Sequence, residues 1–163
     1  MPIYMKIDGI TGSATEQNHT GWIEVHSKQY GVGRSITGTG PGATKGREGG
    51  VPSISEFVMS KPACDASHDL MRESMLGTVP GKKVEIHVTR TGPSNEQVIY
   101  EKFELENCMI SGFSRSCSSN DTPQESVSLN FTKITYSISQ QETDATTGNA
   151  KTSYYDLSLS KGG

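Results

Sequence analysis

The sequence predicts a mainly β fold, in which two antiparallel sheets form a barrel or sandwich with one short flanking helix. Three observations support this prediction. Apolar residues recur with a period of two along most of the chain, as they do in strands with one buried face. Polar segments rich in glycine, proline and asparagine separate these runs and predict turns. A helical period occurs in residues 65–76.

Alternating runs predict the strands in chain order. The clearest runs are residues 3–7, 23–25, 84–89, 127–131, 134–138 and 155–159, and less regular runs at 54–59 and 100–113 predict further strands. Apolar residues change parity between Phe131 and Ile134, which predicts either a β-bulge near Thr132 and Lys133 or two strands joined at a bend. Turns are expected at residues 91–95, 118–123 and 147–149.

The predicted helix is amphipathic. Its apolar face consists of Ala66, Leu70, Met71 and Met75. Asp65 or Ser67 can cap its N-terminus, and Gly77 is suited to end it. Because a helix of about three turns is not stable alone, we expect it to pack on a sheet and close one side of the barrel.

A glycine-rich segment at residues 31–50 interrupts the strand pattern. It holds eight glycines and one proline, and loops of this length inside a domain are commonly functional or disordered. As a flexible chain it would span about 25 Å, enough to reach a neighbouring molecule. Composition leaves two interpretations open, a contact arm or the free tip of a long hairpin. The charged residues of the segment are Arg34, Lys45, Arg47 and Glu48.

The composition argues against several classes of protein. The 163 residues fit one domain spanning 1–163, which leaves no residues for a second, and the net charge of −3 is spread along the chain. No cluster of Lys and Arg could follow a phosphate backbone, so we expect no nucleic-acid partner. No apolar run approaches the roughly 20 residues of a membrane span, and the N-terminus lacks an export signal. We therefore expect synthesis in the cytoplasm and no membrane insertion.

Motifs for cofactor binding and catalysis are incomplete. The glycine-rich segment lacks the Gly-Lys-Ser/Thr sequence that surrounds a phosphate, and no GxGxxG is complete. Ser67, His68 and Asp69 are the residue types of a catalytic triad, but neighbouring helical residues point about 100° apart and cannot relay a proton. We expect His68 at the surface, and no catalytic residue or cofactor.

The remaining reactive side chains lack the spacing of a site. His19, His26 and His87 lie on separate segments without the spacing of metal ligands, so no metal is expected. Glu104 and Glu106 share one strand face and are expected to be solvated edge charges. The three cysteines are odd in number and form no CxxC pair, which indicates free thiols. They are Cys64, Cys108 and Cys117.

Five segments carry motifs in a fixed order. They are IYMKIDGITG at 3–12, HTGWIEV at 19–25, the extended glycine-rich loop, SEFVMSK at 55–61 followed by the short helix, and ESVSLNFTKI at 125–134 with Tyr136. In this order they resemble the Hcp (haemolysin-coregulated protein) family of bacterial type VI secretion, over nearly the whole chain. Two stretches depart from the family pattern: Gly12-Ser13-Ala14 replaces Gly-Glu-Ser, and Pro62-Ala63-Cys64 precedes the helix.

The resemblance implies a structural protein rather than an enzyme. Hcp proteins are two-sheet barrels that assemble as six-membered rings. The rings stack into the inner tube of the secretion machine, inside a contractile sheath and beneath a VgrG spike. The tube is fired out of the cell, and its lumen can hold and chaperone small effectors. By resemblance, we expect homohexamers that are secreted without a signal peptide.

The glycine-rich segment is the candidate ring-stacking contact, with Arg34, Lys45, Arg47 and Glu48 as its charges. Open strand edges and a lean core leave surface for neighbours in a ring. The alternative is a small β-barrel hydrolase or ligand-binding module that uses this segment as a lid. Particle mass distinguishes the two, because a ring has six times the mass of a monomer.

Overall fold

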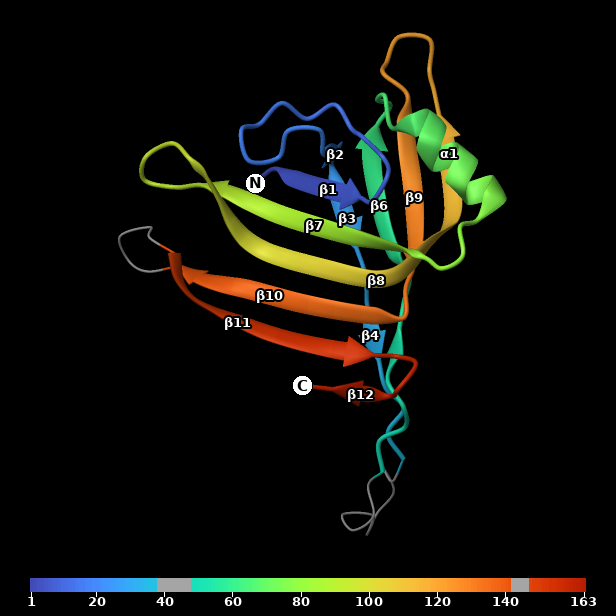
Figure 1. Ribbon diagram of the computed structural model, residues 1–163, viewed down its shortest axis with the longest axis vertical. Helices are drawn as coiled ribbons and strands as arrows, with labels where there is room; N and C mark the ends of the chain where they lie inside the picture. Colours follow the sequence, from blue (N-terminus) through green and yellow to red (C-terminus); the bar gives the residue numbers. More distant parts are fainter. Residues whose placement is uncertain (38–47, 142–146) are drawn as a thin grey trace.

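The computed structural model describes residues 1–37, 48–141 and 147–163, and it confirms a mainly β fold of antiparallel sheets with one helix (Figure 1). In chain order the elements are β1 (Ile3–Ile7), β2 (Ile23–Val25), β3 (Ser27–Gln29), β4 (Val32–Gly33), β5 (Ser53–Ile54), β6 (Phe57–Pro62), α1 (Ser67–Leu76), β7 (Lys82–Thr91), β8 (Gln97–Ser116), β9 (Gln124–Asn130), β10 (Lys133–Gln141), β11 (Thr147–Asp156) and β12 (Lys161–Gly162).

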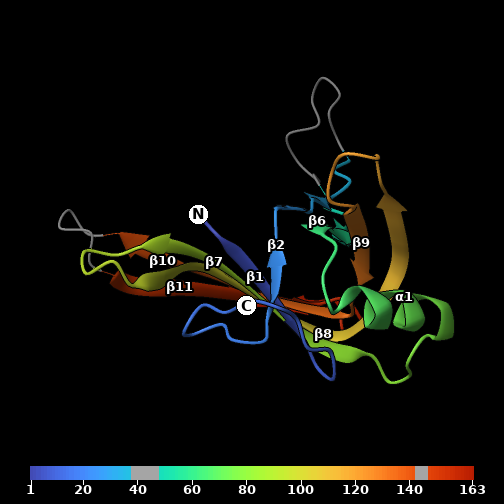
Figure 2. The same ribbon diagram turned by 90° about the horizontal axis from the view of Figure 1, so that it is seen from above.

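Two sheets share one long strand. The first sheet has the order β12-β11-β10-β8-β7-β1-β2, and the second runs β3-β6-β9-β8. Figure 2 shows the second sheet standing at a steep angle on one end of the first, with α1 at the same end. The short pair β4 and β5 forms a separate ribbon that leaves both sheets.

Strand β8 passes from one sheet to the other by bending near Asn107. Up to Cys108 it pairs with β7 and β10, and from Met109 onward it pairs with β9. Asn107 has φ 51°, a left-handed conformation that asparagine tolerates better than most residues, and its side chain accepts a 2.8 Å hydrogen bond from Gly81 N. A Cβ on Gly81 would lie 2.4 Å from Asn107 C, so glycine is required for this approach.

The chain crosses back between the sheets at the same corner. Strand β9 ends in the second sheet, and β10 begins in the first after Phe131 and Thr132. Thr132 N donates to Glu106 O at 3.2 Å, which ties this bend to the neighbouring bend of β8. The predicted change of parity at Thr132 and Lys133 is therefore two strands joined at a bend, rather than a bulge within one strand.

The hydrophobic core lies between the facing sides of the two sheets. At its centre four rings pack in sequence: Tyr30 on Phe57, Phe57 against Phe103, and Phe103 against Tyr136, with centroids 4.9–5.3 Å apart. Phe57 and Phe103 are fully buried and come from the second and first sheets, respectively. Aliphatic residues from β1, β2, β7 and β9 surround these rings.

The helix differs from its prediction in its cap and in its buried face. It begins at Ser67, and the N-cap position is Ala66, which offers no side-chain hydrogen bond. Neither Asp65 nor Ser67 caps it. Gly77 ends the helix as predicted, with φ 62° and its N–H bonded to Glu73 O.

The buried stripe of the helix is narrower than the predicted apolar face. Ala66 and Leu70 are buried, but Met71 and Met75 are 49% and 68% exposed. Glu73, seven residues after Ala66, is half-buried, and its carboxylate contacts Lys82 at 3.9 Å. A ten-residue helix that rests on the edge of a sheet buries only about one residue per turn, so the two methionines face away.

Two predictions near the C-terminus are wrong. Residues 147–149 belong to β11 rather than to a turn, and the β10–β11 connection lies outside the described residues. The last alternating run also ends early, because β11 stops at Asp156. The Asp156 carboxylate accepts hydrogen bonds from Ser158 N and Leu159 N, which turns the chain toward β12 and leaves Leu159 exposed.

We predict that Phe103→Ala lowers the free energy of unfolding by about 3–5 kcal/mol, because a fully buried ring is lost from the centre of the core. Urea unfolding at one fixed protein concentration measures the change. Leu159→Ala is the control, because Leu159 is exposed, and it should change stability by no more than about 0.5 kcal/mol. Equal midpoints for the two variants would contradict this account of the core.

Candidate functional site

The described residues of the glycine-rich segment form a hydrogen-bonded ribbon, here called the arm (residues 31–37 and 48–54). Val32 pairs with Ile54 in β4 and β5, and further out Thr37 N donates to Glu48 O at 3.0 Å. The arm projects away from both sheets (Figure 1). Because its two legs are hydrogen-bonded to each other, the described part of the arm extends in a defined direction, which a flexible chain would not do.

Of the four predicted stacking charges, two can be placed. The Arg34 guanidinium bridges the legs of the arm, with Nε donating to Gly50 O at 2.6 Å and Nη2 to Gly49 O at 3.4 Å. Glu48 is exposed on the opposite leg. Lys45 and Arg47 lie outside the described residues. Arg34 therefore holds the arm together, which the sequence did not suggest.

The root of the arm carries exposed apolar side chains. Val32, Ile36 and Val51 are all more than half exposed. Val32 also lines an apolar groove of about 260 Å³ between the arm and the first sheet. The groove is lined by Tyr30, Val32, Pro52, Ile54, Ile134, Tyr136, Ser153, Tyr154 and Tyr155. A contiguous apolar surface of this kind is typical of protein contact sites.

A buried polar network joins the helix to the second sheet. The Lys61 ammonium donates to Glu125 Oε2 at 2.5 Å and to Ser67 Oγ at 3.1 Å. Ser67 Oγ in turn donates to the same carboxylate oxygen at 2.7 Å and accepts Cys64 N at 3.0 Å. The other oxygen, Oε1, faces Arg115 Nε at 3.5 Å.

This network holds the helix in place rather than catalysing a reaction. A Ser–Lys pair can serve as nucleophile and base, but Lys61 is fully buried and paired with a carboxylate, and Ser67 is nearly buried. His68 is exposed, as expected, and its only side-chain contact in the described structure is Asp69 on the same surface. The triad residues therefore do not act together.

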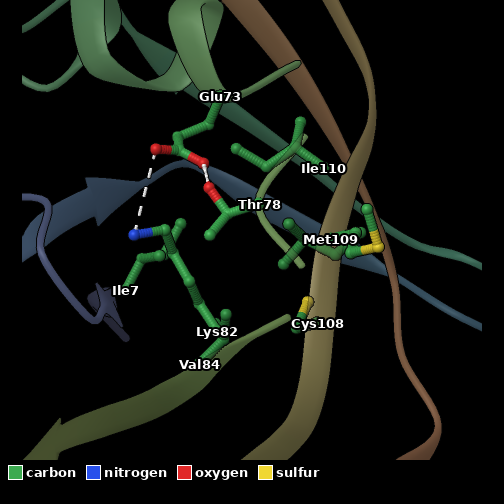
Figure 3. A pocket seen from close by; sticks show the side chains of 9 residues that line it. Ile7, Glu73, Thr78, Lys82, Val84, Cys108, Met109 and Ile110 are labelled. Carbon is green, nitrogen blue, oxygen red and sulfur yellow. Dashed lines mark hydrogen bonds and ion pairs between the residues drawn. The ribbon is translucent and has the colours of Figure 1, made fainter. Parts of the chain in front are cut away.

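The small cavity beneath α1 is too narrow for a substrate (Figure 3). Its volume is about 10 Å³, near the lower limit for one water molecule. Glu73 accepts a hydrogen bond from Thr78 and faces Lys82 on one side, and Cys108 lies on the other. Burial raises the pKa of the Cys108 thiol to about 12, which makes it unreactive at neutral pH.

The cysteines are free, as predicted, but Glu104 and Glu106 are not edge charges, because β8 lies between β7 and β10 in the first sheet. All three cysteines are free, with Cys64 half-buried and Cys117 exposed. Glu104 accepts a 2.6 Å hydrogen bond from Lys102, two residues earlier on the same strand. This ammonium holds the pKa of Glu104 below its usual value. Glu106 pairs with Lys133 at 3.7 Å.

One contact between histidines was not predicted from the sequence. His19 and His87, which are 68 residues apart, meet at 3.0 Å in a buried cluster, because the loop after β1 folds back over β7. Spacing along the chain gives no signal for this contact. In the described ranges no group of three or more His, Cys, Asp and Glu side chains could hold a metal, and no helix is long and apolar enough to cross a membrane.

A family model described as "Type VI secretion system effector, Hcp" matches residues 4–138. The chain belongs to the Hcp family. A comparison with curated protein sequences gave no match. The family assignment therefore rests on the family model, and similarity to solved structures supports the fold.

Solved structures with the same fold cover nearly the whole chain. One described as a type six secretion system protein is 20% identical, with a TM-score of 0.90 over 99% of each chain. Hcp1 from Salmonella typhimurium is 21% identical, with a TM-score of 0.75 over 99% of this chain and 97% of its own. A type VI secretion system effector from Yersinia pestis is 21% identical, with a TM-score of 0.73 over 94% and 98%.

The motifs that resembled Hcp have structural roles in this chain. HTGWIEV contributes His19 and Trp22 to the buried histidine cluster. SEFVMSK ends in Lys61, and ESVSLNFTKI begins with Glu125, so these two motifs meet in the buried network. Residues that carry the Hcp pattern are thus concentrated where distant segments of this fold are joined.

We predict that Lys61→Met destabilises the protein by about 3–5 kcal/mol, because it leaves the Glu125 carboxylate buried without its partner. The double variant Lys61→Met/Glu125→Leu should recover most of this loss, since both charges are then removed. Denaturant unfolding of the single and double variants measures the coupling.

The matched control for this cycle is Lys133→Met, which breaks the more exposed pair with Glu106 and should cost less than about 1 kcal/mol. A double variant as unstable as the sum of the two single variants would show that Lys61 and Glu125 contribute independently.

Proposed function

We propose that this chain forms hexameric rings that stack into the inner tube of a type VI secretion machine. The family match over residues 4–138 is the observation that carries the proposal. Assembly would begin in the bacterial cytoplasm, and the tube would then be secreted without a signal peptide. By family resemblance its partners are a VgrG spike, a contractile sheath, and small effectors held in the lumen.

Ring formation is supported by the open edges of the sheets. Strands β2 and β12 end the first sheet, and β3 ends one side of the second. These edges are short, with two or three residues each, which limits uncontrolled pairing with other chains. Closed rotational symmetry uses such surfaces a fixed number of times, so a ring is finite.

The arm is the proposed contact between rings. It leaves the body of the protomer in a defined direction, it is braced by Arg34, and its root carries exposed apolar residues. A lid over a catalytic or ligand pocket, the alternative function, finds less support. The groove beside the arm is lined almost entirely by apolar and tyrosine side chains, and none of its residues is charged.

We predict that the arm is needed for tubes and not for rings. Residues 37–48 would be replaced by Asn-Gly, because Ile36 and Gly49 already face each other across the arm and this pair suits a two-residue hairpin turn. Light scattering after size exclusion should give six protomers for both wild type and variant. Negative-stain microscopy should show stacked tubes for the wild type only.

A matched variant, Lys45→Ser/Arg47→Ser, keeps the length of the arm and removes two charges. It therefore distinguishes the effect of arm length on stacking from the effect of charge. Tubes that are weakened by moderate salt in the wild type but not in this variant would assign stacking partly to charge. Normal tubes from the shortened variant would rule out the arm as the stacking contact. A monomeric wild type would contradict the ring itself.

A further inference from the structure

The loop between β1 and β2 (residues 8–22, here called the β1–β2 loop) closes on itself and lies over the outer face of the first sheet. Gly12 N donates to Gly21 O at 2.8 Å, and Ala14 N donates to Trp22 O at 2.9 Å. Gly12 approaches the backbone of Trp22 so closely that a Cβ would lie 2.3 Å from Trp22 O. The loop therefore moves as a compact unit.

His19 anchors this unit to the sheet. Its ring is almost completely buried and stacks on Tyr4 of β1, with centroids 4.5 Å apart. Nδ1 contacts the Glu16 carboxylate at 2.5 Å, and Nε2 contacts His87 Nδ1 at 3.0 Å. His87 is on β7, so this contact joins the loop directly to the centre of the first sheet.

The contact between the two imidazoles is a hydrogen bond, with a single hydrogen between the two nitrogens. At 3.0 Å one nitrogen donates and the other accepts. Because Glu16 accepts a hydrogen from His19 Nδ1, a neutral His19 offers its Nε2 lone pair to His87 Nδ1–H. The remaining nitrogen of His87, Nε2, is buried without a hydrogen-bond partner. Protonation of His87 would place a charged N–H at this buried nitrogen with no hydrogen-bond acceptor.

Charged groups from four strands and the loop face the cluster. Next to His87 are Glu85 on β7, with Oε2 at 3.9 Å from Nε2, and Lys102 and Glu104 on β8. Glu24 on β2 lies near the Tyr4 hydroxyl, and Lys6 on β1 lies over the Trp22 ring at 5.9 Å. Burial, then His19 and Lys102, lower the pKa of His87 from 6.5 to about 4, and the two carboxylates only partly offset this.

We propose that the His19–His87 contact is an acid-sensitive latch, which holds the β1–β2 loop on the first sheet at neutral pH and releases it when His87 is protonated. The proposal concerns the single protomer, so it does not depend on ring formation. Release would uncover Trp22, Tyr4 and the charged outer face of β1 and β7.

The direction of the pH effect follows from His87. Its pKa is lower in the docked state (about 4) than in the released state (6.5), so the released state binds more protons between these values. Docking is therefore at full strength above pH 6.5 and weakens as the pH falls toward 4. The docking equilibrium should shift by about tenfold for each pH unit in this window.

Trp22 makes the latch directly measurable, because it is the only tryptophan in the chain and its ring lies 4.5 Å from that of His87. Its fluorescence should change between pH 6.5 and about 4, while the far-ultraviolet circular dichroism of the sheets stays constant. Hydrogen exchange at the loop amides, such as those of Gly12 and Ala14, should accelerate over the same range.

Three variants test the assignment. His87→Gln keeps a donor toward His19 without titrating, so it should abolish the fluorescence transition in this window. His19→Gln should leave the loop released at neutral pH as well, with rapid exchange throughout. His68→Gln is the matched control, because His68 is exposed, and it should behave as the wild type.

The latch is overturned if the wild-type emission is constant from neutral pH to pH 4, or if His87→Gln keeps the wild-type transition. It is also overturned if circular dichroism is lost together with the emission change, because the acid effect is then global unfolding. Should His87→Gln fail to fold, the exchange rates of the wild type and of His19→Gln still decide the outcome.

Discussion

The two sheets are held at a fixed angle because one strand, β8, contributes hydrogen bonds to both of them. Its bend depends on two residues that few others can replace: Asn107 in a left-handed conformation, and Gly81 packed against its backbone. The second crossing, at Thr132, is hydrogen-bonded to the same corner. The facing sides of the sheets can then enclose the stacked rings of Phe57 and Phe103. The arm and the helix are both positioned by connections to β6, whose place is set by β9 and hence by β8.

Two buried polar clusters stabilise this framework in different ways. In the network of Lys61, Glu125 and Ser67, opposite charges meet and the serine both donates and accepts, so the helix is held by an ion pair. In the cluster of His19 and His87, two imidazoles meet, and burial lowers the pKa of His87 to about 4. The ion-pair network suits a permanent contact between the helix and the second sheet. The histidine cluster has a stability that depends on protonation, because an imidazole titrates near neutral pH when it is exposed.

Period-two patterns were sufficient to predict the β fold and most of the strands, because a strand with one buried face shows it directly in the sequence. These patterns did not predict features that depend on contacts between distant segments of the chain. Met71 and Met75 fit a helical stripe, yet they are exposed, and the buried residues in this region are Ala66, Ser67 and Leu70. The hydrogen bonds of Arg34 to carbonyls of its own arm likewise depend on the pairing of the two legs, which the sequence pattern does not show. The meeting of His19 with His87 depends on a loop closure that no local pattern encodes.

The N-terminal strand has consequences for the order of folding. Strand β1 lies between β2, which follows within 20 residues, and β7, whose Val88 pairs with Ile3 across a sequence separation of 85 residues. As the chain emerges from the ribosome, β1 can form only its local pair until β7 is synthesised. Until β7 is synthesised, His19 lacks His87, its hydrogen-bond partner on that strand. A nascent chain therefore leaves Tyr4 and His19 without the cover of β7 through about half of its synthesis, and the β1–β2 loop can dock on the first sheet only after β7 has formed.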